Sequence, residues 1–175
     1  MNTRIKVLYS NTGIYFLFQC EDVQLNATIT EDNKQLWKED VVEIFLWLDE
    51  SEENYFEYEL SPLNYELPLL IMNMDGKPHR WQPWFYEDKR NISHKTSAIG
   101  GPKESGSNIK KWIAEFYIPY ELLAPIKKNT PNSGTKWRSN FYRMDYSYGK
   151  ETYWSWQKVR TNFHDLDSFG TLLFD

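Results

Sequence analysis

A pair of tryptophans near the C-terminus has the spacing of a surface that could stack against a flat ligand. Trp154 and Trp156 are separated by one residue within the run Thr152–Gln157. In an extended strand, residues two apart point to the same face, so the two indoles would lie side by side. An indole face carries negative potential, and the C–H face of a sugar is apolar and weakly positive. The pair therefore predicts a platform for a sugar, the alternative being that one or both rings belong to the core.

A second candidate pairs an aromatic ring with a carboxylate. Trp37 falls in a charged loop just before the expected strand Val41–Asp49, and Glu43 follows on the face of that strand that points away from the main core. There we expect the carboxylate to stay ionised and to accept hydrogen bonds from sugar hydroxyls, while the ring takes the apolar face of the sugar. The alternative is a tryptophan lid on the sheet edge beside a solvated glutamate.

Two further clusters carry polar or aromatic side chains. In the expected strand Lys136–Ser147, Arg143 and Asp145 share a side with Trp137, and they form either a structural ion pair or a ligand contact. The aromatic run 80–86 is predicted to be a loop, in which we expect Trp84 to pack rather than bind.

Catalytic patterns are weak. A glycosidase needs two carboxyl groups with separated pKa values on either side of the scissile bond. Glutamates that could supply them occupy ordinary outward strand positions, and the histidine, aspartate and serine near the C-terminus lie too close in sequence for a typical triad. These residues are Glu43, Glu57, Glu59 and Glu115, and His164, Asp165 and Ser168.

Metal and cofactor signals are equally sparse. The three histidines show no metal-ligand spacing, and the chain has no glycine-rich phosphate loop. A calcium site built from oxygen ligands stays open, with Asp22, Asp32 or Asp40 as candidate ligands.

Composition restricts the class of protein. The 175 residues are predicted to form one domain, 1–175, and the net charge of −5 argues against a general nucleic-acid surface. No apolar run is long enough to span a membrane, and residues 1–6 lack the apolar core of a signal peptide. Cys20 is the only cysteine, and we expect it to be a buried apolar residue.

The hydropathy pattern has a period of two along most of the chain, and the 30 aromatic residues favour β-structure. About nine short strands are expected, with one helical turn after Pro119 and a turn-rich loop over 93–108. The prediction is an all-β fold, a two-sheet antiparallel β-sandwich of jelly-roll or immunoglobulin-like type with at most short helical turns. The expected strands cover residues 4–9, 14–20, 41–49, 55–60, 67–74, 112–118, 136–147, 152–157 and 171–174.

Several short motifs, in order along the chain, resemble the carbohydrate-binding modules of family 9 and their CBM9-like relatives in the DOMON-type superfamily. They lie at residues 6–9 with 14–16, 37–45, 55–62, 112–115 with 118–119, 137–143, and 163–165 with 169–170.

The resemblance implies a non-catalytic domain that holds a sugar unit, from a plant-type polysaccharide such as xylan or cellulose, between two tryptophans. Trp37 and Glu43 match the first ring and its carboxylate partner, Trp154 or Trp156 matches the second ring, and Arg143 is a further candidate contact. The resemblance also implies a structural calcium ion, which some members have. It implies a secreted or extracytoplasmic location and a role in polysaccharide degradation. Partners would be a carbohydrate and other domains, or a second copy of the chain.

The same resemblance raises two other expectations. Family members usually carry a further N-terminal segment before the strand that starts here at Arg4, so we expect this chain to lack it. The superfamily also includes haem-binding and redox domains, and a haem would need axial ligands such as methionine and histidine. The candidates are Met72, Met74, His79 and His164. A glycoside hydrolase is the least favoured alternative.

Overall fold

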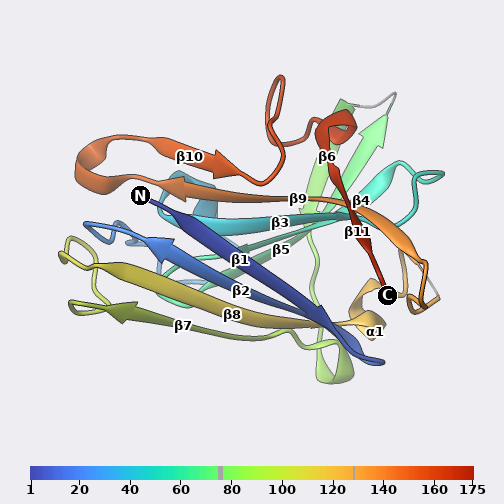
Figure 1. Ribbon diagram of the computed structural model, residues 1–175, viewed down its shortest axis with the longest axis horizontal. Coiled ribbons are helices and arrows are strands. Elements are labelled where there is room, and N and C mark those ends of the chain that lie inside the picture. Colours follow the sequence, from blue (N-terminus) through green and yellow to red (C-terminus); the bar gives the residue numbers. More distant parts are fainter. Residues whose placement is uncertain (75–76, 128) are drawn as a thin grey trace.

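Two antiparallel sheets stack face to face in the computed structural model, which describes residues 1–74, 77–127 and 129–175 (Figure 1). The smaller sheet has the order β1-β2-β8-β7, and the larger has the order β10-β9-β3-β4-β5-β6 with β11 also paired to β9. The strands are β1 (Thr3–Tyr9), β2 (Gly13–Glu21), β3 (Val41–Trp47), β4 (Asn54–Leu60), β5 (Glu66–Met74), β6 (Lys77–Pro83), β7 (Ser93–Ile99), β8 (Lys111–Pro119), β9 (Lys136–Asp145), β10 (Thr152–Ser155) and β11 (Gly170–Leu173). The predicted all-β sandwich is confirmed.

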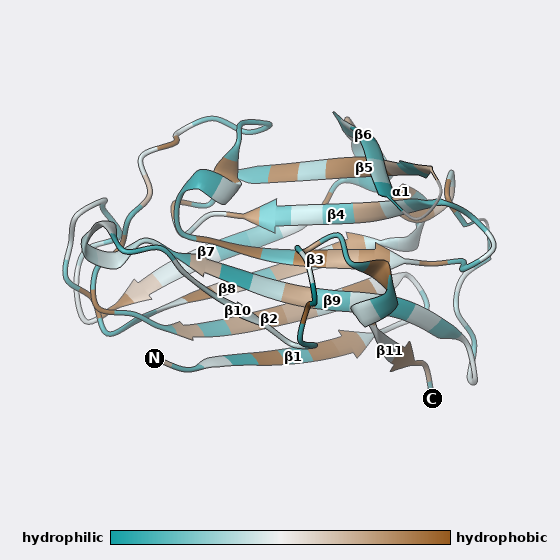
Figure 2. Cartoon of the chain, turned by 90° about the horizontal axis from the view of Figure 1, so that it is seen from above, coloured by the Kyte–Doolittle hydropathy of each residue, from teal (hydrophilic) through white to brown (hydrophobic). Residues whose placement is uncertain are grey.

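The main core lies between the sheets and follows from the alternation of the strands. Val42, Ile44 and Leu46 of β3 point into it, and aromatic rings join the two sheets across it. The ring centroids of Tyr58 and Phe116 are 4.9 Å apart, for example. Figure 2 looks down on the larger sheet and shows apolar and polar residues alternating along these strands.

A second apolar layer covers the outer face of the larger sheet. Phe45 and Met144 point to this side, where Leu166 and Phe169 from the connection between β10 and β11 pack over them. In Figure 1 this connection rises above the larger sheet. Most of that face is therefore shielded from water, and polar groups on it must find partners or stay neutral.

Two strands were not expected from the sequence. β6 falls on the predicted loop 80–86, and β7 falls within the predicted loop over 93–108. Both are edge strands with mostly exposed side chains, so they lack the apolar alternation that marks a half-buried strand.

Smaller expectations are also resolved by the structure. The helical turn after Pro119 is the single-turn helix α1 (Tyr120–Leu123), and Cys20 is fully buried. Trp84 packs edge-on against Phe56 of the main core, with ring centroids 6.3 Å apart.

Candidate functional site

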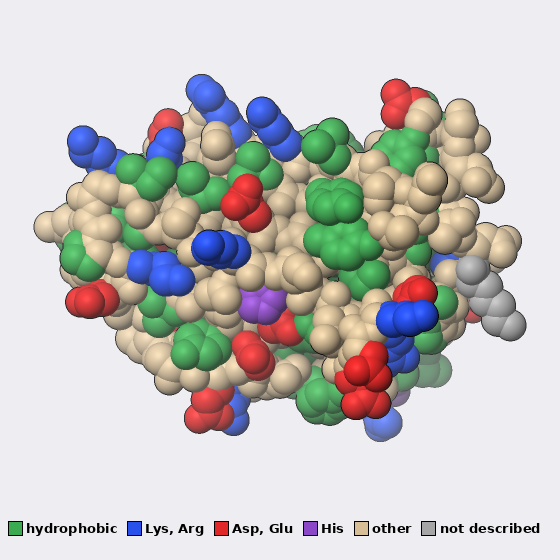
Figure 3. Space-filling model, turned by 90° about the horizontal axis from the view of Figure 1, so that it is seen from below, with side chains coloured by type: hydrophobic (Ala, Val, Ile, Leu, Met, Phe, Trp, Pro, Cys, Tyr) green, Lys and Arg blue, Asp and Glu red, His purple; other side chains and the backbone are tan. Residues whose placement is uncertain are grey.

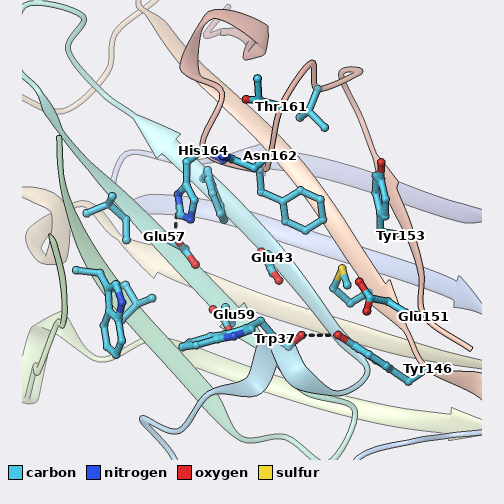
Figure 4. A pocket seen from close by; sticks show the side chains of 17 residues that line it. Trp37, Glu43, Glu57, Glu59, Tyr146, Glu151, Tyr153, Thr161, Asn162 and His164 are labelled. Carbon is cyan, nitrogen blue, oxygen red and sulfur yellow. Dashed lines mark hydrogen bonds and ion pairs between the residues drawn. The ribbon is translucent and has the colours of Figure 1, made fainter. Parts of the chain in front are cut away.

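A pocket of about 460 Å³ opens on the outer face of the larger sheet, within the size range of small-molecule sites, about 300–1,000 Å³ (Figure 4). Strands β3, β4, β5 and β6 form one side of it, and β9, β10 and the β10–β11 connection form the other. It is lined by Trp37, Glu43, Phe45, Glu57, Glu59, Leu69, Ile71, Trp81, Met144, Tyr146, Glu151, Tyr153, Val159, Thr161, Asn162, Phe163 and His164.

Three carboxyl groups form the floor of the pocket. Glu43 of β3 lies directly opposite Glu59 of β4 in the strand register, and Glu57 lies two residues from Glu59 on the same face. Figure 4 shows the three side chains close together in the centre of the pocket. The sequence folds this way because each of these strands alternates between the main core and the outer face.

The floor carboxyls are almost fully buried, with 2% of Glu43, 4% of Glu57 and 1% of Glu59 exposed. Burial raises the pKa of Glu57 to about 8. Burial, with the neighbouring charge of Glu57, raises the pKa of Glu43 well above its usual range. The same causes, including Glu43, raise the pKa of Glu59. The expectation that Glu43 stays ionised is therefore wrong, because the second apolar layer shields it from solvent and favours its protonated form.

Several oxygens of this floor have no partner among the described residues. They are Glu43 Oε1, Glu57 Oε2 and both side-chain oxygens of Glu59. A protonated carboxyl can donate one hydrogen bond and accept others, whereas a carboxylate only accepts. The floor is thus able to bond several hydroxyl groups of a ligand at once.

Trp37 forms one wall and is held by the short 3₁₀ turn η1 (Leu36–Lys38). The hydroxyl of Tyr146 donates to the backbone carbonyl of Trp37 over 3.0 Å (Figure 4). Nearby, the buried carboxyl of Asp40 accepts hydrogen bonds from the backbone N–H groups of Asn26 and Tyr146. Trp37 meets Trp81 of β6 edge-on, with ring centroids 5.9 Å apart.

The opposite wall comes from the connection between β10 and β11. Phe163 stacks on Tyr142 with ring centroids 4.1 Å apart, and the Tyr142 hydroxyl donates to the Phe163 carbonyl over 2.7 Å. Tyr153 of β10 meets the edge of Phe163 at 5.5 Å. These contacts fix an aromatic wall across the pocket from Trp37.

His164 lies beside the carboxyl floor. Its Nδ1 atom is 2.5 Å from the Tyr55 hydroxyl and 3.9 Å from Glu57 Oε2. Burial lowers the pKa of His164 to about 4, so the imidazole is neutral at physiological pH and adds no positive charge to the pocket.

The sequence model for carbohydrate-binding family 9 matches residues 2–174, nearly the whole chain. The chain belongs to carbohydrate-binding family 9. A search of curated proteins finds no significant match.

Two solved structures share the fold of this family 9 chain. A candidate carbohydrate-binding protein from Bacteroides uniformis ATCC 8492 is 17% identical with a TM-score of 0.77, over 99% of this chain and 78% of the other. A family 9 carbohydrate-binding module from Caldicellulosiruptor kristjanssonii in complex with cellotriose is 16% identical with a TM-score of 0.64, over 98% of this chain and 74% of the other. At these identities the likeness concerns the fold.

The structure brings together only part of the predicted site. Trp37 and Glu43 line the same pocket, as their spacing suggested, while Trp154, Trp156 and Arg143 do not line it. The expected arrangement of Trp37 facing Trp154 or Trp156 is therefore not observed. The reason is strand alternation: Trp154 pairs with Arg143, whose side chain points away from the pocket, and Tyr153 pairs with Met144, which lines it.

The two C-terminal tryptophans do share a face, but each meets other groups. The Arg143 guanidinium lies 4.8 Å from the centre of the Trp154 ring. Trp156 stacks on Phe141 of the main core, with centroids 5.0 Å apart, and keeps 42% of its surface exposed.

Arg143 is the centre of a buried ion network. One of its guanidinium nitrogens lies 2.5 Å from Asp145 Oδ2 and 3.0 Å from Asp22 Oδ2, and only 1% of Arg143 is exposed. The structural ion pair between Arg143 and Asp145 is confirmed, and the side chain is out of reach of a ligand in the pocket.

Sequence reasoning did not assign Tyr153, Phe163 or the Glu57–Glu59 pair to the site. The alternation of β4 places Glu57 and Glu59 on the face opposite to the main core. The pairing of β3 with β4, had it been predicted, would have placed both residues beside Glu43. Tyr153 follows from taking the opposite face of β10. Phe163 belongs to an irregular connection, for which the sequence has no periodic signal.

The catalytic and haem candidates do not form a site together. The Ser168 hydroxyl donates to Asp165 Oδ2 over 2.6 Å, and Asp165 also binds Arg160, whereas His164 faces Tyr55. The described contacts thus do not connect the three residues as a triad. Among the methionines and histidines considered for haem, His164 lines the pocket, and Met72, Met74 and His79 do not.

The aspartates considered for calcium are engaged elsewhere. Asp22 bonds Arg143 and Ser147, Asp40 bonds backbone N–H groups, and Asp32 Oδ1 accepts the N–H of Glu66. Within residues 1–74, 77–127 and 129–175, no group of three or more His, Cys, Asp or Glu is arranged to hold a metal ion. Ca²⁺ also binds backbone and amide oxygens, so a structural calcium ion stays a prediction.

Proposed function

We propose that this chain holds a mono- or oligosaccharide unit in the pocket between Trp37 and the wall formed by Tyr153 and Phe163. The observation that carries the proposal is the position of Trp37 beside the buried carboxyl floor, where an oxygen of Glu43 has no hydrogen-bond partner among the described residues. Aromatic rings fit the apolar C–H face of a pyranose, and the floor bonds its hydroxyls. Membership of carbohydrate-binding family 9 supports the same ligand class.

Plant-type polysaccharides such as cellulose and xylan supply the first ligands to test. The family 9 module of known structure from Caldicellulosiruptor kristjanssonii is in complex with cellotriose, a short cellulose fragment. The pocket is open to solvent on the outer face of the sheet, which suits a sugar unit at the end of a chain.

The proposed binding is non-catalytic. Glycosidases usually separate the pKa values of two carboxyls so that one is protonated and one ionised across the scissile bond. Here Glu43, Glu57 and Glu59 lie on one floor, and burial raises the pKa of all three. Carboxyls gathered on one side of the pocket, rather than on either side of a bond, suit recognition of hydroxyl groups.

Titration calorimetry and tryptophan fluorescence with xylo- and cello-oligosaccharides test the proposal. We expect saturable binding with a change in Trp emission. Binding should be lost in Trp37→Ala, with folding checked by circular dichroism. If no oligosaccharide in a broad panel binds or alters the fluorescence, the proposed function is wrong. Release of reducing sugar from a polymer would contradict the non-catalytic part.

We further propose that the chain acts outside the cytoplasm within a polysaccharide-processing system, with other domains or a second copy as partners. The family membership supports this setting. In the described part of the chain, no helix has the length and apolar character to cross a membrane. Fractionation of the native host, followed by detection of the chain, tests the location.

A further inference from the structure

The strongly ionisable side chains that line the pocket are acidic. Among the residues that the structure describes, its lining includes four glutamates, Glu43, Glu57, Glu59 and Glu151, but no lysine or arginine. His164 is held neutral by burial. The charge of Arg143 is already neutralised by Asp22 and Asp145 outside the pocket.

A groove on the smaller sheet shows that this composition is not general for the surface. That groove is lined by Lys6 and Lys95 together with Glu115. Figure 3 views the molecule from that side, and Lys, Arg and acidic side chains are interspersed there around apolar ones. The pocket on the larger sheet therefore differs from it by containing acids without cations.

The floor lacks the positive partner that buried carboxyls normally need. Glu43 and Glu59 face each other directly, only 1% of Glu59 is exposed, and neither carboxyl forms an ion pair with a cation of the described residues. Buried charges in proteins are paired or neutralised by protonation. A positively charged group on a ligand would supply the missing partner from outside the chain.

The walls suit the same kind of ligand. Trp37 and Trp81 on one side and Tyr153 and Phe163 on the other offer ring faces and edges. Ring faces attract cations as well as sugar C–H groups. An ammonium group has three N–H donors and no acceptor, which matches a floor of three carboxyls better than a hydroxyl does.

We infer that the pocket prefers a sugar unit that carries a free ammonium group, as in glucosamine oligomers, over the neutral sugar of the same ring. This inference rests on the proposed carbohydrate binding and names its ligand class. An amino sugar keeps the pyranose ring and its C–H face, so the aromatic walls serve both ligands. The ammonium group adds the charge that the floor lacks.

Binding of such a ligand is coupled to proton release. Burial favours the protonated carboxyls, and an ammonium group of a ligand would stabilise their ionised form. The proton that leaves goes to solvent, and the ligand remains cationic. The ionisable groups that line the pocket or pack behind its floor are Glu43, Glu57, Glu59, Glu151, Tyr146, Tyr153 and His164, with Tyr55 and Tyr142 behind.

Calorimetry with three trimers of similar size tests the inference: cellotriose, the glucosamine trimer and the N-acetylglucosamine trimer. At about pH 6.5 an amine with a pKa near that of an α-amino group is charged. We expect the glucosamine trimer to bind at least tenfold more tightly than either neutral trimer. Titrations in two buffers with different ionisation enthalpies should show proton release for the glucosamine trimer alone.

Variants separate the floor from general charge effects. Glu59→Gln should reduce the ratio of glucosamine-trimer to cellotriose affinity, and Glu115→Gln on the other sheet should leave that ratio unchanged. If Glu59→Gln does not fold, Glu151→Gln at the exposed rim serves instead. Equal or tighter binding of cellotriose by the native chain overturns the ammonium preference and leaves the proposed function standing. Absence of binding for all three trimers overturns the ammonium preference, and the proposed function falls with it only if the xylo-oligosaccharides of the wider panel also fail to bind.

Discussion

Glu43 and Glu59 lie directly opposite each other on the paired strands β3 and β4, and each is almost completely buried. Like charges in opposed positions destabilise a sheet, and buried charges need partners. Burial and mutual repulsion therefore favour the protonated form of both carboxyls, and two such groups facing each other do not stabilise the sheet.

The first prediction concerns the pH dependence of stability. Glu57 has a usual pKa near 4.5 and a folded value raised to about 8. Above pH 4.5 the folded state holds a proton that the unfolded state releases, so stability falls as pH rises from about 4.5 to about 8, by up to about 1.4 kcal/mol per pH unit. Glu57→Gln removes this loss, so the variant should gain thermal stability relative to the native chain as pH increases over that range.

Other groups also titrate over this range, so the difference between the two proteins is the quantity to measure. Burial raises the pKa of Asp40 to about 7 and lowers that of His164 to about 4, with opposite effects on stability. Both are present in variant and native chain. Glu57→Gln also removes a charge that raises the pKa of Glu43 and Glu59, which adds to the gain of the variant in the same direction. A difference in melting temperature that stays constant from about pH 5 to pH 8 would contradict the assigned burial of Glu57.

A second prediction separates the tryptophans. Trp37 lines the pocket, whereas Trp156 stacks on Phe141 outside it. Trp37→Ala should weaken binding of a sugar ligand at least about tenfold, or 1.4 kcal/mol. Trp156→Ala should leave the affinity nearly unchanged. Calorimetry on both variants checks this prediction. If Trp156→Ala weakens binding and Trp37→Ala does not, the sugar binds at the C-terminal tryptophans instead.

The sequence was a good guide to the fold where strands are half-buried. Val42, Ile44 and Leu46 alternate with Glu43 and Phe45, and the structure has this alternation with two apolar layers. It was a poor guide at the edges, because β6 and β7 carry mostly exposed side chains and give no apolar period.

The sequence predicted one wall and part of the floor of the pocket, but not the opposite wall. Trp37 and Glu43 are close in sequence and lie in one pocket, but the second wall required knowing which face of β10 points outward. The spacing of Trp154 and Trp156 shows that they share one face of the strand. It does not show whether that face points to the pocket or to the main core. Tyr153, one residue away, is on the pocket side.

The third prediction addresses the buried ion network. Arg143→Met would leave Asp22 and Asp145 without their cation in the interior. Loss of one partner of a buried pair costs about 3–5 kcal/mol, which urea denaturation can measure. Lys34→Met, which removes a surface pair with Glu31, is the matched control and should cost about 0–1 kcal/mol. Similar costs for both variants would show that Arg143 is not structural.

The last prediction tests why β11 begins with a glycine. A Cβ atom at Gly170 would lie 2.6 Å from the Cη2 and Cζ3 atoms of Trp156, whose ring is held against Phe141. Gly170→Ala should therefore destabilise the fold by about 1–3 kcal/mol through overpacking. In a Trp156→Ala background the clash disappears, so the same change should cost little. Thermal unfolding of the two single variants and the double variant gives the coupling energy, and a value near zero would mean that Gly170 does not make room for Trp156.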